Sequence, residues 1–342
     1  MELLLTKNPL VSTLKLHSTK DVVPSFIDKA TNINIATGFI TNDSIAELKS
    51  IVEYKSDNFK LNLFIGMNYL DGFTRIQYNA VKELDKLISQ KEAGSIFLSP
   101  KALFHGKMYS FLNGNSCLGS FVGSSNLGSF LDKNANYIEA DILFKGEEAS
   151  ILDSHIGYII KSLGIPFGEI DQIVSFKEPE QQVLKGYDHV EKVTNNYIDT
   201  LKRKKTGKVA RMRFKTDPKS NLNTYFGAGK IKNRYSPRGW YEVELILGKK
   251  TEAATLLPVN GPFTVVTQDG YSFKLSRQGD YNKNLRSESN LKILGRWIKG
   301  HMENEGALQI GEPVTEDTIS KFGKSHLVFE ETTDGVWLLS ME

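Results

Sequence analysis

The stretch Phe104-His105-Gly106-Lys107-Met108 places a histidine two residues before a lysine, and Gly123-Ser124-Ser125-Asn126 follows it. Apolar residues around these two motifs predict strands over residues 103–112 and 117–122. Side chains at positions i and i+2 of a strand point to the same face, so His105 is expected to point with Lys107, and Ser124 with Asn126. Each motif therefore predicts a pair of polar side chains that act together.

These side chains suit chemistry at phosphorus. A neutral imidazole such as that of His105 can attack phosphorus covalently, while the ammonium of Lys107 and the donors of Ser124 and Asn126 can hold phosphoryl oxygens. A carboxylate such as Glu139 would fix the tautomer of the imidazole. The candidate catalytic residues are thus His105, Lys107, Ser124, Asn126 and Glu139. The alternative is a satisfied strand histidine followed by an ordinary Gly-Ser turn, and the rarity of the ordered pair of motifs within about 25 residues disfavours it.

Strands and helices alternate around the two motifs. Hydrophobic periodicity predicts strands over residues 32–40, 60–67, 95–98 and 137–143, besides the two above, and helices over 42–52, 74–91 and 147–163. Such alternation predicts an α/β domain with a mixed sheet flanked by helices, which we place at residues 1–170.

The sequence changes character after this domain. Residues 171–198 are polar and charged, and we expect a linker there. Beyond it, short strands are predicted over residues 209–214, 241–247, 263–267, 272–275, 326–330 and 336–340, and helices over 291–304 and 316–322. A strand-rich domain, a small open barrel with two helices, is therefore expected at residues 199–342.

Charge is concentrated in one window of this second domain. The net charge of the 342 residues is +3, whereas residues 199–250 hold 15 basic and 4 acidic side chains, a net +11. Such a stretch is typical of a polyanion-binding surface, the alternative being a solvated face of a basic protein. Aromatic and small polar residues lie between the charges, for example in Arg213-Phe214-Lys215, and this favours a nucleic-acid partner.

Other sequence features concern the compartment. Cys117 is the one cysteine, so no intramolecular disulfide can form and a reducing cytosol is expected. The first residues do not form a signal peptide, and no run of about 18 apolar residues is present, so we expect a cytoplasmic protein without a membrane segment.

The motifs at residues 104–126 resemble the signature of the phospholipase D superfamily, His-x-Lys followed by Gly-Ser-x-Asn. The opening Ile35-Ala36-Thr37-Gly38-Phe39 is also similar to that superfamily. Two departures exist: the acid that usually stands five residues after the lysine is replaced by Leu112, and the gap between the motifs is a few residues longer. That acid supports the site in the superfamily and does not attack phosphorus. Its absence therefore leaves the nucleophile that the resemblance implies, His105, in place.

The resemblance implies a composite active site. Catalysis in the superfamily uses two histidines across a pseudo-twofold axis, and this chain has one copy of the motif. A C2 homodimer through the N-terminal domain would supply the second copy. One His105 would form a phosphohistidine, and the other would protonate the leaving oxygen and then activate water. No cofactor and no metal ion are expected, since Glu47-Leu48-Lys49 lies in a predicted helix and Asp217-Pro218-Lys219 in the basic window.

Segments of the second domain extend the resemblance. Pro237-Arg238-Gly239-Trp240-Tyr241, Asp269-Gly270-Tyr271, Leu294-Gly295-Arg296-Trp297 and Phe322-Gly323-Lys324 resemble a family of restriction endonucleases that joins a phospholipase D-type nuclease domain to a DNA-binding domain of plant B3 type. In that family two arms grip DNA from the major groove, and here they correspond to residues 215–238 and 274–283. The implied DNA-binding residues are Lys215, Lys219, Ser220, Asn223, Tyr225, Arg234, Arg238, Lys274, Arg277, Gln278, Asn282 and Lys283, while Trp240 and Trp297 are expected in the core. Arginine would pair with guanine, and asparagine or glutamine with adenine.

These features together predict a sequence-specific, metal-independent double-stranded DNA endonuclease of the type II restriction class, with a cognate DNA methyltransferase as companion. Two alternatives stay open: a nuclease subunit that needs a separately encoded ATPase, and a DNA-binding protein whose first domain is an inactive dimerisation domain. A lipid-hydrolysing enzyme is disfavoured, because the chain has a second basic domain and no membrane segment.

Overall fold

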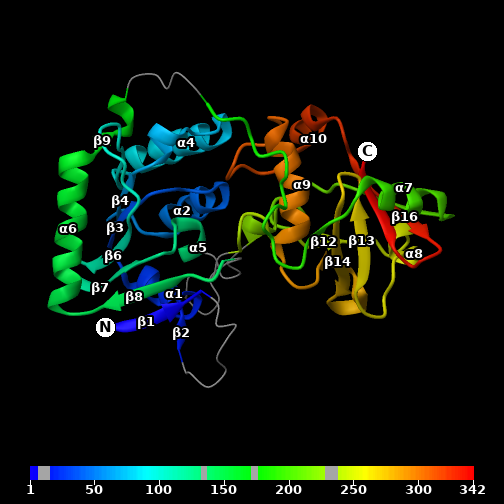
Figure 1. Ribbon diagram of the computed structural model, residues 1–342, viewed down its shortest axis with the longest axis horizontal. Coiled ribbons are helices and arrows are strands. Elements are labelled where there is room, and N and C mark those ends of the chain that lie inside the picture. The colour runs from blue at the N-terminus through cyan, green and yellow to red at the C-terminus, as the bar shows by residue number, and fades with distance from the viewer. Residues whose placement is uncertain (7–15, 132–136, 171–175, 228–237) are drawn as a thin grey trace. The chain divides into compact units, whose positions relative to one another are not determined.

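The computed structural model describes residues 1–6, 16–131, 137–170, 176–227 and 238–342 (Figure 1). The chain divides into two compact units. One contains the described residues up to Pro179, and the other contains those from Glu180 onward. Each unit has its own sheet and its own core.

The first unit is built on a nine-stranded sheet with the order β2-β1-β8-β7-β6-β3-β4-β5-β9. Strands β3, β4 and β5 pair in parallel, whereas β6, β7, β8 and β1 pair antiparallel, so the sheet is mixed. The predicted α/β class is confirmed. The strands are β1 (Glu2–Leu5), β2 (His17–Ser18), β3 (Asn32–Thr37), β4 (Lys60–Ile65), β5 (Gly94–Leu98), β6 (Lys107–Asn113), β7 (Ser116–Gly123), β8 (Ala140–Phe144) and β9 (Ile165–Pro166).

Helices cover both faces of this sheet. Figure 1 shows α6 on one side and α2 and α4 on the other. On the α6 side, Ile156 and Ile159 pack in one cluster with Ala36 and Phe64 of the sheet. The helices are α1 (Thr19–Lys29), α2 (Asn42–Tyr54), α3 (Asn68–Asp71), α4 (Arg75–Gln90), α5 (Leu127–Leu131), α6 (Glu147–Leu163) and the 3-10 turn η1 (Phe167–Glu169). The sequence interpretation did not include α1, α3 or α5.

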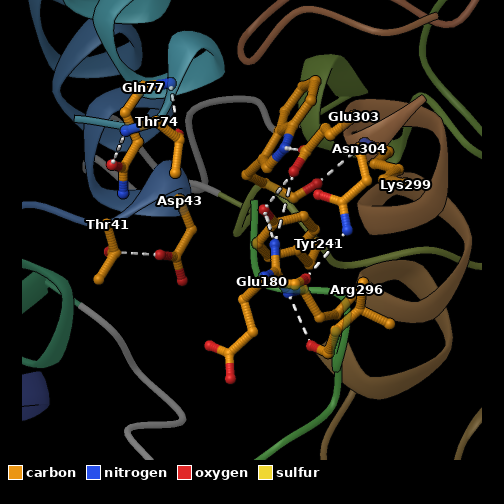
Figure 2. A network of polar contacts seen from close by, with 12 residues as sticks. Thr41, Asp43, Thr74, Gln77, Glu180, Tyr241, Arg296, Lys299, Glu303 and Asn304 are labelled. Carbon is orange, nitrogen blue, oxygen red and sulfur yellow. Dashed lines mark hydrogen bonds and ion pairs between the residues drawn. The ribbon is translucent and has the colours of Figure 1, made fainter. Parts of the chain in front are cut away.

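Capping side chains mark where two of these helices begin. The Thr74 hydroxyl accepts from the Gln77 backbone N–H at 3.2 Å, and the Gln77 side-chain oxygen accepts from the Thr74 N–H at 3.1 Å, which starts α4 (Figure 2). Thr41 and Ser44 form the same reciprocal pair at the start of α2. Such caps satisfy amide groups that a helix leaves free at its first turn.

The second unit contains an eight-stranded sheet, in which the order β11-β16-β17-β13-β14-β15-β12 runs across and β10 pairs with β14. Its strands are β10 (Glu191–Lys192), β11 (Lys205–Arg213), β12 (Leu245–Ile246), β13 (Phe263–Thr267), β14 (Tyr271–Gln278), β15 (Asn284–Ser287), β16 (His326–Thr332) and β17 (Trp337–Met341). Its helices are α7 (Asn195–Arg203), α8 (Glu252–Leu256), α9 (Lys292–Asn304) and α10 (Glu316–Phe322), with 3-10 turns η2 (Thr224–Gly227) and η3 (Asp280–Asn282). The predicted strand-rich fold is confirmed.

Several predicted strands were wrong in their bounds; those expected over residues 32–40 and 137–143, for example, are β3, which ends at Thr37, and β8, which begins at Ala140. Two further cases have an identifiable cause. The strand expected over residues 241–247 is reduced to β12, because Tyr241 is buried in a turn and donates its hydroxyl to Glu303 of α9. The strand expected over residues 103–112 begins only at Lys107, so His105 lies in the segment before β6. In both places a contact distant in sequence takes the backbone away from the sheet.

A buried polar network joins α9 to the turn before β12 (Figure 2). The Glu303 carboxylate, fully buried, accepts from Trp240 Nε1 at 2.7 Å and from the Tyr241 hydroxyl at 2.8 Å. Lys299, also fully buried, donates to the Trp240 carbonyl at 2.8 Å and lies 3.9 Å from the centre of the Trp240 ring. Burial lowers the pKa of Lys299 to about 7, against the opposing charge of Glu303. Trp240 and Trp297 are in the core, as predicted.

Because Lys299 is buried in this network, the free energy of unfolding should depend on pH, and Lys299→Met should remove that part of the pH dependence. Between pH 7 and 10.5 the unfolded chain binds a proton at Lys299 that the folded chain has released, so folding stability rises with pH in that window. Relative to Lys299→Met, the wild-type free energy of unfolding should rise by up to about 1.4 kcal/mol per pH unit from pH 7.5 to 9.5. Tryptophan fluorescence during urea unfolding measures it, because all three tryptophans belong to the second unit.

The matched control is Lys321→Met, at an exposed lysine of α10. Its unfolding free energy should follow the wild-type pH dependence. If the free energy of unfolding changed with pH in the same way in wild type and in Lys299→Met, the lowered pKa of Lys299 would be contradicted.

Candidate active site

The segment that carries His105 crosses the ends of β3 and β4 at two glycines. A Cβ atom on Gly66 would lie 2.2 Å from the Phe104 carbonyl oxygen, and one on Gly38 would lie 3.2 Å from His105 Cα. The Phe104 ring packs edge-on against the Phe64 ring, with the ring centres 5.2 Å apart. The close approach therefore requires glycine at position 66, and it places the exposed His105 side chain beyond the end of the sheet.

Lys107 holds the imidazole of His105 from the first position of β6. Its Nζ lies 3.0 Å from Nδ1 and 3.2 Å from Nε2 of the ring, and it donates to the His105 carbonyl oxygen at 2.7 Å. Burial lowers the pKa of Lys107, and the nearby charge of Glu139 acts in the opposite direction. A positive group thus stands beside the exposed ring, where it can meet an anionic substrate.

Ser124 and Glu139 form a second pair. The Ser124 hydroxyl donates to the Glu139 carboxylate and accepts from the Ala140 backbone N–H at 3.0 Å. The role of Glu139 in orienting the imidazole stays a prediction, and the described hydrogen bond of its carboxylate is with Ser124. The reason is geometric: β7 and β8 are antiparallel neighbours, which brings residues 124 and 139 together at their shared end.

Asp141 is a site residue that the sequence interpretation missed. This fully buried side chain of β8 accepts from the Ser125 hydroxyl at 2.5 Å and from the Ser125 N–H at 3.3 Å, while the Tyr109 hydroxyl donates to the Ser125 carbonyl at 2.6 Å. A Cβ on Gly123 would lie 2.2 Å from the Asp141 carboxylate, so glycine is required there too. Burial raises the pKa of Asp141, and the Ser125 hydrogen bonds oppose that rise.

The loop after β7 is therefore held at Ser125, the variable position of its motif. Ser124 and Asn126 flank this anchor, and the Oδ1 atom of Asn126 is buried without a hydrogen-bond partner among the described residues. The signal for Asp141 was present in the sequence, because an acid at the inward phase of an apolar strand, next to Leu143, requires a buried partner.

Leu112 lies far from this cluster. It pairs with Asn32 at the opposite end of β6, five residues from Lys107, which corresponds to about 17 Å along a strand. An acid at that position would not contact the imidazole, so its replacement by leucine leaves the described cluster unaltered.

The structure does not assemble the metal-binding alternatives considered from sequence. Glu47 is buried on α2, and Asp217 accepts from the Asn221 side chain at 2.8 Å. Within the described ranges, no group of three or more histidine, cysteine, aspartate or glutamate side chains is placed to hold a metal ion. The described chain also has no helix that is both long and apolar enough to cross a membrane.

Three of the expected DNA-binding side chains are buried and have structural roles. The Asn223 side chain donates to the Val314 carbonyl oxygen and accepts from the Val314 N–H, both at 2.8 Å. The ring centres of Tyr225 and Trp240 lie 5.3 Å apart. Arg277 donates to the carbonyl oxygens of Ala254 and Leu257, both at 2.9 Å. These three expectations are corrected, since each side chain is committed to satisfying the core of the second unit.

The other expected DNA-binding residues are accessible where described. Lys219, Lys274, Asn282 and Lys283 are exposed, Lys215, Ser220, Arg238 and Gln278 are half-buried, and Arg234 lies outside the described residues. Lys215 donates to the Ile246 carbonyl at 2.6 Å, which fixes its direction along the surface.

Comparisons with known families match both units. Residues 19–165 match the family model described as the NgoFVII restriction endonuclease N-terminal PLD domain, where PLD is phospholipase D. Residues 193–333 match the model described as the NgoFVII C-terminal B3-like DNA-binding domain. No curated protein sequence matches the chain. Together the two family matches cover most of its length.

Solved structures that resemble parts of the chain do so at low scores. TrmBL2, an archaeal chromatin protein, is 12% identical over 48% of this chain and 53% of its own, with a TM-score of 0.30. The phospholipase D family member Nuc from Salmonella typhimurium is 18% identical over 44% of this chain and 91% of its own, with a TM-score of 0.31. NucT from Helicobacter pylori is 17% identical over 43% of this chain and 91% of its own, with a TM-score of 0.28. The chain thus spans about half the length of the TrmBL2 chain.

The Ser125–Asp141 contact predicts a stability loss in Ser125→Ala that grows with pH. Without the hydroxyl, the pKa of Asp141 rises further, so the ionised carboxylate at high pH costs more folding free energy than the protonated form at low pH. We expect a loss of about 1–3 kcal/mol at pH 8 and a smaller loss at pH 5. Calorimetric unfolding of the full chain at both pH values measures it.

Ser150→Ala is the control, because this hydroxyl is exposed in the first turn of α6. Ser150→Ala should leave the calorimetric unfolding transition unchanged at both pH values. An equal loss at pH 5 and pH 8 in Ser125→Ala would contradict an ionisable partner.

Proposed function

Because the chain belongs to the family of NgoFVII-type restriction endonucleases, in which a PLD domain precedes a B3-like DNA-binding domain, we propose that it is a sequence-specific, metal-independent double-stranded DNA endonuclease. The observation that carries this proposal is the exposed imidazole of His105 beside the Lys107 ammonium, with Ser124, Asn126 and Glu139 at neighbouring strand ends.

The first step is attack on phosphorus by a ring nitrogen of His105. A P–N bond forms, and the P–O bond to the leaving oxygen breaks. The Lys107 ammonium and the Asn126 side-chain amide stabilise the negative charge on the non-bridging oxygens. The leaving oxygen takes a proton from an imidazolium, which is His105 of the partner subunit.

The second step returns the enzyme to its starting state. The imidazole of the partner's His105, now neutral, takes a proton from water, and the resulting oxygen nucleophile attacks phosphorus. The P–N bond breaks, which leaves a terminal phosphate on DNA and a free imidazole on His105. Both steps conserve protons and need no further reactant.

The need for two imidazoles supports a homodimer with one composite site. A chain with one copy of the motif supplies one such ring, and a C2 interface brings the same patch of two subunits together. Leu103 is 73% exposed two residues before His105, and Tyr137 and Ile138 are about as exposed immediately before Glu139. Apolar side chains of this kind, next to the reacting groups, favour burial against a second copy.

The second unit would deliver this site to a DNA sequence. Its B3-like match and the net +11 of residues 199–250 support DNA as the partner. The accessible polar residues Lys219, Gln278 and Lys283 belong to the two stretches expected to contact DNA.

The chemistry is tested by cleavage in excess EDTA with His105→Ala as the comparison. Wild type should cut duplex DNA without divalent ions, and His105→Ala should lose at least about 10⁴-fold in rate, because the nucleophile is removed. His155→Ala, an exposed histidine on α6, is the matched control and should keep the rate. A strict magnesium requirement would contradict the proposal.

Further outcomes separate the alternatives. Cleavage that appears only with an added ATPase would make the chain a subunit of a larger complex, and site-specific binding without any single-turnover cleavage would make the PLD domain an inactive scaffold. A protein–DNA adduct trapped under alkaline quench in wild type, and absent in His105→Ala, would support the phosphohistidine.

The composite site is tested by Leu103→Glu. A charge at this position should not be tolerated in a buried interface, so the mass in solution should fall from about twice 38.4 kDa to 38.4 kDa, and cleavage should be lost. Ile151→Glu, at an exposed apolar residue of α6, is the control. Full activity of a strictly monomeric Leu103→Glu variant would refute a composite site.

A further inference from the structure

One carboxylate in the second unit holds two arginines. Glu244 Oε2 accepts from Arg238 Nη2 at 3.4 Å, and Glu244 Oε1 accepts from Arg286 Nη1 at 3.2 Å. The three side chains are 38%, 29% and 22% exposed for Arg238, Arg286 and Glu244, respectively. This Arg238–Glu244–Arg286 cluster is therefore accessible to a large ligand but already ordered.

Further contacts orient the cluster. Arg286 of β15 donates through Nη2 to the Gln278 side chain of β14 at 3.2 Å, and Arg238 lies 3.7 Å from a Glu242 carboxylate oxygen. A guanidinium has five N–H donors in a fixed plane, and the described contacts of each arginine use only part of them. The remaining donors are held in a defined direction, which lowers the entropy lost on binding.

A hollow of about 110 Å³ lies beside the cluster. Lys219, Ser220, Arg238, Glu244 and Asn284 line it, so the first of the two stretches expected to contact DNA borders this space. Lys219 and Arg238 supply donors to this space, and Glu244 supplies acceptors. The hollow therefore offers donors and acceptors together.

This mixture of charges discriminates between two parts of DNA. A phosphate would be repelled by the Glu244 carboxylate, and a site for phosphate alone would need only cations. The major-groove edge of a G·C pair presents the O6 and N7 acceptors of guanine beside the N4 donor of cytosine. Arginine matches the first two atoms in a bidentate contact, and glutamate matches the third.

We propose that the Arg238–Glu244–Arg286 cluster reads G·C base pairs in the major groove, with the arginines on guanine and Glu244 both positioning them and accepting from cytosine. This inference rests on the DNA-binding function proposed above. A stabilising role alone gives a weak account of the cluster, because partly exposed ion pairs contribute about 0–1 kcal/mol.

The test uses the full chain with His105→Ala as background, so that bound DNA stays intact. Duplexes are selected from a random library, and affinities are then measured for the selected site and for each of its single-base variants. We expect at least one essential G·C position. Arg286→Gln should lower the preference at such a position by about 5- to 100-fold, which corresponds to one lost bidentate contact.

Glu244→Gln separates reading from folding. It keeps the shape of the side chain but no longer holds two cations, so the G·C preference should fall while affinity for unrelated duplexes stays within about twofold. Lys283→Gln, at an exposed lysine, is the contrasting variant: it should weaken all sequences about equally and reduce the salt dependence by about one phosphate contact. Unchanged tryptophan fluorescence excludes misfolding in each variant.

Two results overturn the inference without touching the proposed function. One is a selected site with no essential G·C pair. The other is uniform weakening of all sequences by Arg286→Gln with a reduced salt dependence, which would place Arg286 on phosphate. A chain that binds no duplex at all overturns both the inference and the DNA-binding function.

Discussion

The buried carboxylate of Asp141 fixes the loop that carries Ser124 and Asn126, two of the predicted site residues. It is removed from water on β8, and two hydrogen bonds from Ser125 compensate part of that cost. Because the backbone of Ser125 is held from both sides, by Asp141 and by Tyr109, its neighbours Ser124 and Asn126 have little freedom. Preorganised donors of this kind lose little free energy when charge develops on a phosphoryl group.

Glycine has a matching role at the same end of the sheet. Gly66 and Gly123 stand where a backbone or a carboxylate approaches to 2.2 Å of the position a Cβ would occupy. The imidazole segment and the loop after β7 can therefore lie close to the strand ends. Steric room and electrostatic anchoring together hold His105 with Lys107, and Ser124 with Glu139, at the ends of neighbouring strands.

The second unit separates polar side chains into two classes that look alike in sequence. Asn223 and Arg277 are buried and satisfy backbone groups, whereas Arg238 and Arg286 remain partly exposed and share one carboxylate. An arginine that is both accessible and oriented is suited to recognise a planar ligand edge, since its donors need not be ordered on binding. The unit thus combines a rigid core, centred on Trp240 and Glu303, with a polar surface of defined geometry.

Local periodicity in the sequence determined most of the elements. The helices at Glu147–Leu163 and Glu316–Phe322 and the strand at Phe263–Thr267 have the predicted bounds, because apolar spacing and end signals act within a few residues. The same local motifs predicted His105 and Lys107, whose side chains the structure places in contact, and Ser124, whose described side-chain partner is Glu139. Tertiary structure alone decided which of the predicted DNA-binding side chains are buried, since Asn223 meets Val314 from 91 residues away and Arg277 meets the carbonyl oxygens of Ala254 and Leu257. Burial depends on such distant partners, and no spacing rule within one segment contains them.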